Sequence, residues 1–189
     1  MKSSNHFKIK VILLTLFLFL KSPAFAQEIK LANLNIDNTR DYLMLFFNVK
    51  GAFQEKIKQS VLIGVPVTFS FFVTIYQIRD MWIDKKTEEL EINHTIKYNT
   101  LKKEFTVRRS WEKENLQITK SFSEAQKLMN NVDQLKVVLL SRLEKDRKYQ
   151  IRVKAEIIKD RQPIDIHYVS DLFAKWNLTA EWYTIDFIY

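Results

Sequence analysis

The sequence predicts a mainly β protein with two or three short helices, folded as a single-domain antiparallel β-sandwich or open barrel. Several segments alternate apolar and polar residues with a period of two, which is typical of half-buried strands. Short connections join most of these segments, which favours antiparallel pairing. The 189 residues hold only two Gly and three Pro, too few for a low-complexity chain, and they include no Cys to form disulfides.

The N-terminal segment 1–26 is typical of a secretory signal peptide. Three lysines near the start of the chain precede an apolar run over 11–20, and Ala24-Phe25-Ala26 has the small-residue pattern of a cleavage site. We expect cleavage after Ala26, which leaves residues 27–189 as one exported domain. An apolar run this short does not cross a bilayer, since crossing needs about 20 residues, so retention as a membrane anchor is the weaker alternative.

Two strands are expected first. Residues 28–36 alternate weakly, and a change of phase near Ala32-Asn33 predicts a β-bulge. A turn over 37–39 follows. Residues 42–49 are apolar on both faces, which is typical of a strand inside a covered sheet.

A helix and a long strand are expected next. Apolar residues over 53–63 have helical spacing, and Gly64 ends the helix. The stretch from Gln59 to Ile78 carries no charge, and hydropathy alone would allow a membrane span there. Residues 67–75 alternate large apolar with small polar side chains, so we expect a half-buried strand instead.

The middle of the chain predicts a hairpin, a short strand and a second helix. Apolar residues alternate over 90–98, and those of 105–107 continue the same face after a turn at 99–102. Residues 116–118 predict the short strand. The segment Ser121-Phe122-Ser123-Glu124 has the spacing of a helix capping box.

The last third returns to strands. Alternation predicts strands over 134–140 and 149–157, whereas residues 164–173 fit a short helix or a strand. Apolar residues of 176–182 share one face of a final strand, and those of 183–187 lie on its other side.

Short segments spread over the exported part of the chain resemble one known family through their order and spacing. They are Gly64-Val65-Pro66-Val67-Thr68-Phe69, Asp80-Met81-Trp82-Ile83-Asp84, Tyr98, Phe105-Thr106-Val107, Phe122-Ser123-Glu124-Ala125 and Trp176-Asn177-Leu178-Thr179-Ala180-Glu181-Trp182-Tyr183. With these segments the chain is similar to the exported bacterial proteins called domain of unknown function family 4390. The loop at Arg161-Gln162-Pro163 departs from the Leu-Pro pairing of that family.

The resemblance implies a small signal-bearing protein in the periplasm of a Gram-negative bacterium. It supplies no catalytic residues. It also implies a link with a membrane sensor kinase of the nitrogen type, because family members are often encoded beside one.

The sequence contains no recognised catalytic motif. It has no Gly-x-Ser-x-Gly, no nucleophilic Cys and no phosphate loop. His94 lies between two isoleucines on an apolar face without a second His at ligand spacing, so we interpret it as a hydrogen-bonded histidine of the core or its rim. His167 is interpreted as a surface residue. We therefore predict a protein that is not an enzyme and has no cofactor or metal; a carboxylate pair assembled by the fold is the enzymatic alternative.

Two clusters are candidate interaction sites. The segment Arg79-Asp80-Met81-Trp82-Ile83-Asp84 interrupts the strand pattern and places an aromatic residue among charges. A second cluster combines two arginines with a tryptophan. Either cluster, or a sheet edge, is expected to contact an envelope protein such as the membrane sensor kinase. The candidate residues are Trp82, Asp80, Asp84, Arg108, Arg109 and Trp111.

Other ligands are weaker alternatives. Half of the net charge of +8 comes from four lysines in the signal, so the exported domain is only mildly basic. Its basic clusters are interpreted as a solvated face, with peripheral contact to an anionic membrane surface as the alternative. Nucleic acid is not expected for an exported protein. Most aromatic residues are expected in the core; if they left a cavity, the protein would carry a lipid or another apolar molecule.

Overall fold

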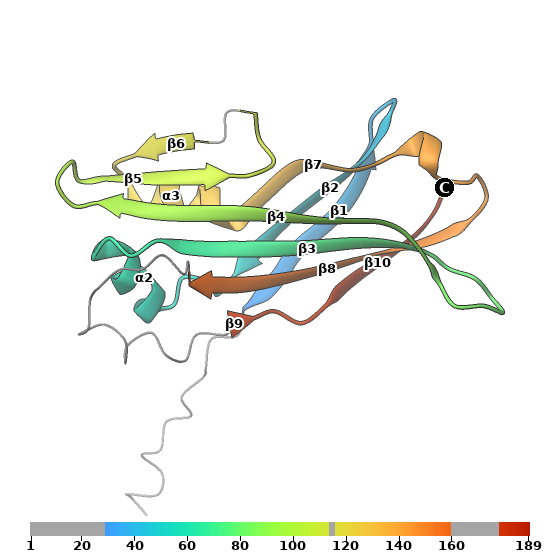
Figure 1. Ribbon diagram of the computed structural model, residues 1–189, viewed down its shortest axis with the longest axis horizontal. Coiled ribbons are helices and arrows are strands. Elements are labelled where there is room, and N and C mark those ends of the chain that lie inside the picture. Colours follow the sequence, from blue (N-terminus) through green and yellow to red (C-terminus); the bar gives the residue numbers. More distant parts are fainter. Residues whose placement is uncertain (1–28, 114–115, 160–177) are drawn as a thin grey trace, which may run out of the picture.

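The computed structural model describes residues 29–113, 116–159 and 178–189, which form ten strands and two α-helices (Figure 1). A short 3₁₀ turn follows the seventh strand at Leu140–Arg142. The elements are β1 (Lys30–Asn38), β2 (Tyr42–Lys50), α2 (Glu55–Leu62), β3 (Val67–Gln77), β4 (Lys85–Asn99), β5 (Glu104–Arg109), β6 (Leu116–Thr119), α3 (Phe122–Asn130), β7 (Asn131–Leu139), β8 (Lys148–Lys159), β9 (Leu178–Thr179) and β10 (Tyr183–Ile188).

The strands form two antiparallel sheets. The smaller sheet has the order β1-β2-β7, and the larger has the order β10-β8-β3-β4-β5-β6, with β9 paired to β8. In Figure 1 the smaller sheet crosses the larger one obliquely, and α2 and α3 lie toward one end of the larger sheet. Neither sheet closes into a barrel in the described residues. The expected class, a mainly β antiparallel sandwich with short helices, is confirmed.

The core lies between the facing sides of the two sheets. On β3, the alternate side chains from Val67 to Ile75 are at most 2% exposed, as its period of two predicts. Across the interface, the rings of Phe47 on β2 and Phe71 on β3 meet edge to face, 5.3 Å apart. Burial of each such side chain contributes about 1.5–3 kcal/mol, so this interface is the main source of stability.

The two helices pack on the larger sheet. Ile57 of α2 and Met129 of α3 are buried in the same core as the strands. The start of α3 forms only half of the predicted capping box: the Ser121 side chain accepts a hydrogen bond from the backbone N–H of Glu124, 3.3 Å away, whereas the Ser121 N–H donates to Thr119 Oγ1 and not to the Glu124 carboxylate. The end of α2 also follows the prediction: Gly64 takes a φ of +90°, which other residues rarely adopt.

The predicted hairpin and bulge are confirmed. The prediction of one continuous final strand is wrong, because its described residues form two separate strands. β4 and β5 pair around a turn after Asn99, and β1 has a register shift between Ala32 and Asn35. At the C-terminus, β9 is only Leu178–Thr179 and β10 starts at Tyr183. The backbone N–H of Ala180 still bonds to the carbonyl of Ala155 on β8, and the strand is interrupted after it, where Glu181 and Trp182 are exposed.

Several predictions fall outside the described residues. These are the signal peptide, the segment 164–173, His167 and the loop at Arg161-Gln162-Pro163. Among the described residues, no helix has the length and apolar character to span a membrane. The uncharged stretch from Gln59 to Ile78 is divided between α2 and β3.

Candidate functional site

The β3–β4 hairpin ends in an exposed apolar tip. Met81, Trp82 and Ile83 follow one another there, and their side chains are 90%, 80% and 91% exposed. We call these three residues the apolar tip. The hairpin lies at the end of the larger sheet away from α2 and α3 (Figure 1). Contiguous exposed apolar side chains are unfavourable in water, and large patches of them mark interaction sites.

The base of this hairpin is attached to β8. Asp84 accepts a hydrogen bond from Arg152 Nη2 at 3.4 Å, and the guanidinium of Arg152 lies over the Tyr76 ring, 4.2 Å from its centroid. The backbone N–H of Ile78 donates to the carbonyl of Lys148 at 2.9 Å. Asp84 is therefore a structural residue of the hairpin base, whereas Asp80 is exposed. These contacts fix the direction in which the tip is presented.

The second candidate cluster, Arg108, Arg109 and Trp111, is only partly exposed. Arg108 is exposed, but Arg109 is 9% exposed and pairs with Glu112, whose carboxylate accepts from Arg109 Nε at 2.8 Å. The expectation of a solvated basic surface is wrong for Arg109, because the turn after β5 brings an acidic partner back onto it. Trp111 is partly buried beside this ion pair.

His94 links three parts of the core. Its side chain is fully buried, its Nδ1 lies 2.9 Å from the carbonyl of Met129, and its Nε2 accepts a hydrogen bond from Trp111 Nε1 at 2.9 Å. A carbonyl only accepts, so Nδ1 carries the proton. The pKa of His94 is lowered from 6.5 to about 4, mainly because burial disfavours the charged imidazolium; the hydrogen bond to Met129 opposes this shift and the charge of Arg109 adds to it. The prediction of a hydrogen-bonded core histidine is confirmed.

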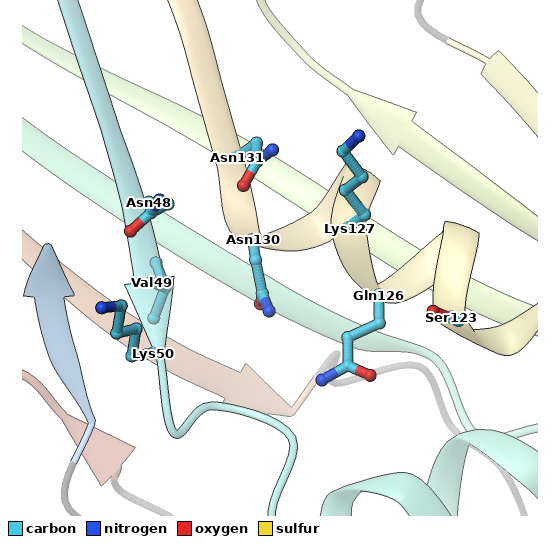
Figure 2. Close-up of a pocket in the computed structure, with 8 residues that line it drawn as sticks. All are labelled: Asn48, Val49, Lys50, Ser123, Gln126, Lys127, Asn130 and Asn131. Carbon is cyan, nitrogen blue, oxygen red and sulfur yellow. The ribbon is translucent and has the colours of Figure 1, made fainter. Parts of the chain in front are cut away.

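A polar depression lies between the end of β2 and α3 (Figure 2). It has a volume of about 270 Å³. The side-chain oxygens of Asn48 and Asn130 are buried at its edge without a hydrogen-bond partner, a condition that costs about 1–3 kcal/mol per group. No local signal in the sequence indicates this depression, because its residues are distant along the chain. It is lined by Asn48, Val49, Lys50, Ser123, Gln126, Lys127, Asn130 and Asn131.

A second depression lies on the outer face of the larger sheet, beside the hairpin base. Its volume is about 490 Å³, and it is lined by Thr74, Tyr76, Gln150, Arg152, Trp182 and Thr184. Both depressions open to solvent. The lipid-carrier interpretation required an unfilled space between the sheets, and it stays a prediction.

One known family matches a part of the chain that includes both helices and strands of both sheets. A family model matches residues 26–186. The protein belongs to the family Domain of unknown function (DUF4390). The resemblance predicted from the sequence is thereby confirmed. No curated protein and no solved structure matches the DUF4390 chain.

Within the part of the chain that the structure describes, no three His, Asp or Glu residues are grouped so that they would hold a metal ion. Among the described features, the apolar tip and the two depressions suit binding best. The tip has three consecutive apolar residues that are each at least 80% exposed, so it is the first candidate for contact with a protein.

Proposed function

We propose that this DUF4390 protein is an exported, non-catalytic interaction module that docks its apolar tip onto an envelope protein. The observation that carries the proposal is the exposure of three consecutive large apolar side chains, of which Trp82 is 80% exposed. Tryptophan is enriched among the residues that dominate binding energy at protein interfaces. The extracytoplasmic part of a membrane sensor kinase is the first candidate partner, on the gene neighbourhood that the family resemblance implies.

The size of the tip indicates a weak, transient contact. Burial of three large apolar side chains contributes on the order of 5–9 kcal/mol in total. Association itself costs roughly 4–15 kcal/mol in lost freedom of motion. The tip alone therefore gives little net affinity, and the charged residues around it have to add specific contacts.

The charges around the tip favour a protein partner over an anionic membrane. Asp80 is exposed, and Arg79 and Lys85 are exposed on either side of the tip. Mixed signs suit a complementary protein surface, because each charge finds a partner there. An anionic lipid surface attracts only the basic residues and repels Asp80.

The test is site-specific photo-crosslinking in cells that produce the full chain with its signal. A photoreactive amino acid replaces Trp82 in one variant and Lys97 in the control, since Lys97 is also exposed but lies on the outer face of β4. We expect a discrete protein adduct at position 82 and none at position 97. No adduct at 82, equal adducts at both positions, or adducts with lipid alone would each contradict the proposal.

The same cells test export. Mass spectrometry of the recovered protein should give an N-terminus at Gln27. An intact N-terminus would contradict cleavage and would favour the alternative in which the segment 1–26 anchors the protein.

A further inference from the structure

The outer face of the larger sheet contains an ordered array of polar and aromatic side chains. The strand registers place Thr74, Arg152 and Thr184 side by side across β3, β8 and β10. Tyr76 lies two residues after Thr74 on β3, on one side of this line. Trp182 lies two residues before Thr184, just before β10, and so on the other side of the line. The depression of about 490 Å³ is within the range of about 300–1,000 Å³ that small-molecule sites occupy.

The polar groups of the depression are held in place by one another. Arg152 Nε donates to Gln150 Oε1 at 2.6 Å, and Gln150 Nε2 donates to Asp186 Oδ1 at 2.7 Å. Arg152 also contacts Asp84 and stacks on Tyr76. Side chains that are already oriented lose little freedom when a ligand binds, so the array favours binding.

The charges of the depression favour an uncharged ligand. Arg152 lies beside Asp84, and the Nζ of Lys154 is 2.6 Å from a carboxylate oxygen of Glu156. Both cations near the depression therefore have carboxylate partners, which would compete with a phosphate or a carboxylate of a ligand. A suitable ligand instead has several hydroxyl or amide groups and no net charge.

The aromatic side chains add a second requirement. Trp182 is 53% exposed, and the Nζ of Lys154 lies 5.7 Å from its ring centroid. Trp182 presents ring surface to a ligand that has an apolar face, whereas the Tyr76 ring is stacked by the guanidinium of Arg152. A sugar ring has both properties, because its C–H faces are apolar and its edge carries hydroxyl groups.

We propose that this depression binds an uncharged glycan chain. Trp182 stacks on the face of a sugar ring, and the linked side chains of Arg152, Gln150 and Asp186 bond the hydroxyl groups. The flat outer face of a sheet suits an extended chain, such as a β-1,4-linked one. This site goes beyond the proposed docking function and shares no residue with the apolar tip.

The test is calorimetric titration of the purified protein with chitohexaose, cellohexaose and maltohexaose. We expect saturable binding of a β-1,4-linked sugar, weakened at least tenfold by Trp182→Ala and by Arg152→Ala. The matched control is Trp82→Ala, which removes an exposed tryptophan outside the depression and should leave the affinity unchanged.

Two further measurements make the result decisive. Circular dichroism checks that each variant folds, and Trp182→Phe, which keeps an aromatic face, should retain most of the affinity if Trp182→Ala is unstable. No saturable binding of any of the three sugars, or binding that survives both Trp182→Ala and Arg152→Ala, would overturn the proposal. Tighter binding of maltohexaose than of the other two would overturn the β-linked, extended geometry. Failure of crosslinking at position 82 would leave this glycan site unaffected.

Discussion

The replacement His94→Gln should remove a specific part of the pH dependence of stability. His94 has a folded-state pKa of about 4 and an ordinary value of 6.5, because burial disfavours its charged form. Between these two pH values the unfolded chain binds a proton at His94 that the folded chain does not. The stability from neutral His94 is therefore complete above pH 6.5 and is lost as pH falls toward 4.

The magnitude follows from the two pKa values. The free energy of unfolding changes by at most about 1.4 kcal/mol per pH unit for one group. Over most of the range from pH 7 to pH 5 the free energy of unfolding falls at close to this rate. His94 should therefore account for a loss of roughly 2 kcal/mol in the free energy of unfolding. Gln is a suitable replacement because its amide both donates and accepts, and His94 uses one donor and one acceptor.

The measurement is urea unfolding of the wild-type protein and of His94→Gln at several values from pH 7 to pH 5, followed by circular dichroism. The variant should be less stable at neutral pH, and the gap between the two proteins should narrow by roughly 2 kcal/mol as the pH falls. Other titrating groups, including His167, are common to both proteins and cancel in the difference. A gap that stays constant over this range would refute the buried, neutral state of His94.

Three replacements test the packing and the helix ends. Phe71→Ala should lower the free energy of unfolding by about 3–5 kcal/mol in urea, because its ring is fully buried; an equal loss for the half-buried Phe72→Ala would contradict the assignment of faces. Ser121→Ala should cost about 1 kcal/mol, whereas Ser123→Ala, exposed in the first turn, should cost less; equal losses would argue against the cap. Gly64→Ala should lower the melting temperature through a backbone strain of about 1 kcal/mol, because the φ of Gly64 is +90°. A Cβ at this position would meet no atom closer than 3.5 Å, so no clash adds to the strain. An unchanged melting temperature would show that this strain is absent.

The parts of the fold that were predicted from the sequence have local signals. The cap at Ser121 involves residues three positions apart, and the alternation along β3 is visible in consecutive residues of one strand. The bulge in β1 also produces a local change of phase near Asn33. Such features depend on neighbours along the chain, so a single sequence is sufficient to find them.

The parts that were missed depend on distant residues. Arg152 meets Asp84, which lies far back along the chain, and the outer depression needs Tyr76 and Trp182 on either side of it. Nothing in the sequence near any of these residues indicates the others. The burial of Arg109 was missed for a related reason: the pattern shows two adjacent arginines, whereas the alternation of β5 turns one outward and the other inward onto Glu112.

The bulge in β1 also bears on how the protein behaves at high concentration. Among the described strands, β1 is at the edge of the smaller sheet, where it pairs with β2. A long regular edge would allow a second molecule to add its own strand and begin a fibril. The shift between Ala32 and Asn35, with Asn33 at a φ of +54°, interrupts the edge near its middle. In the described residues, this irregularity makes the β1 edge a poorer template for a strand of a second molecule.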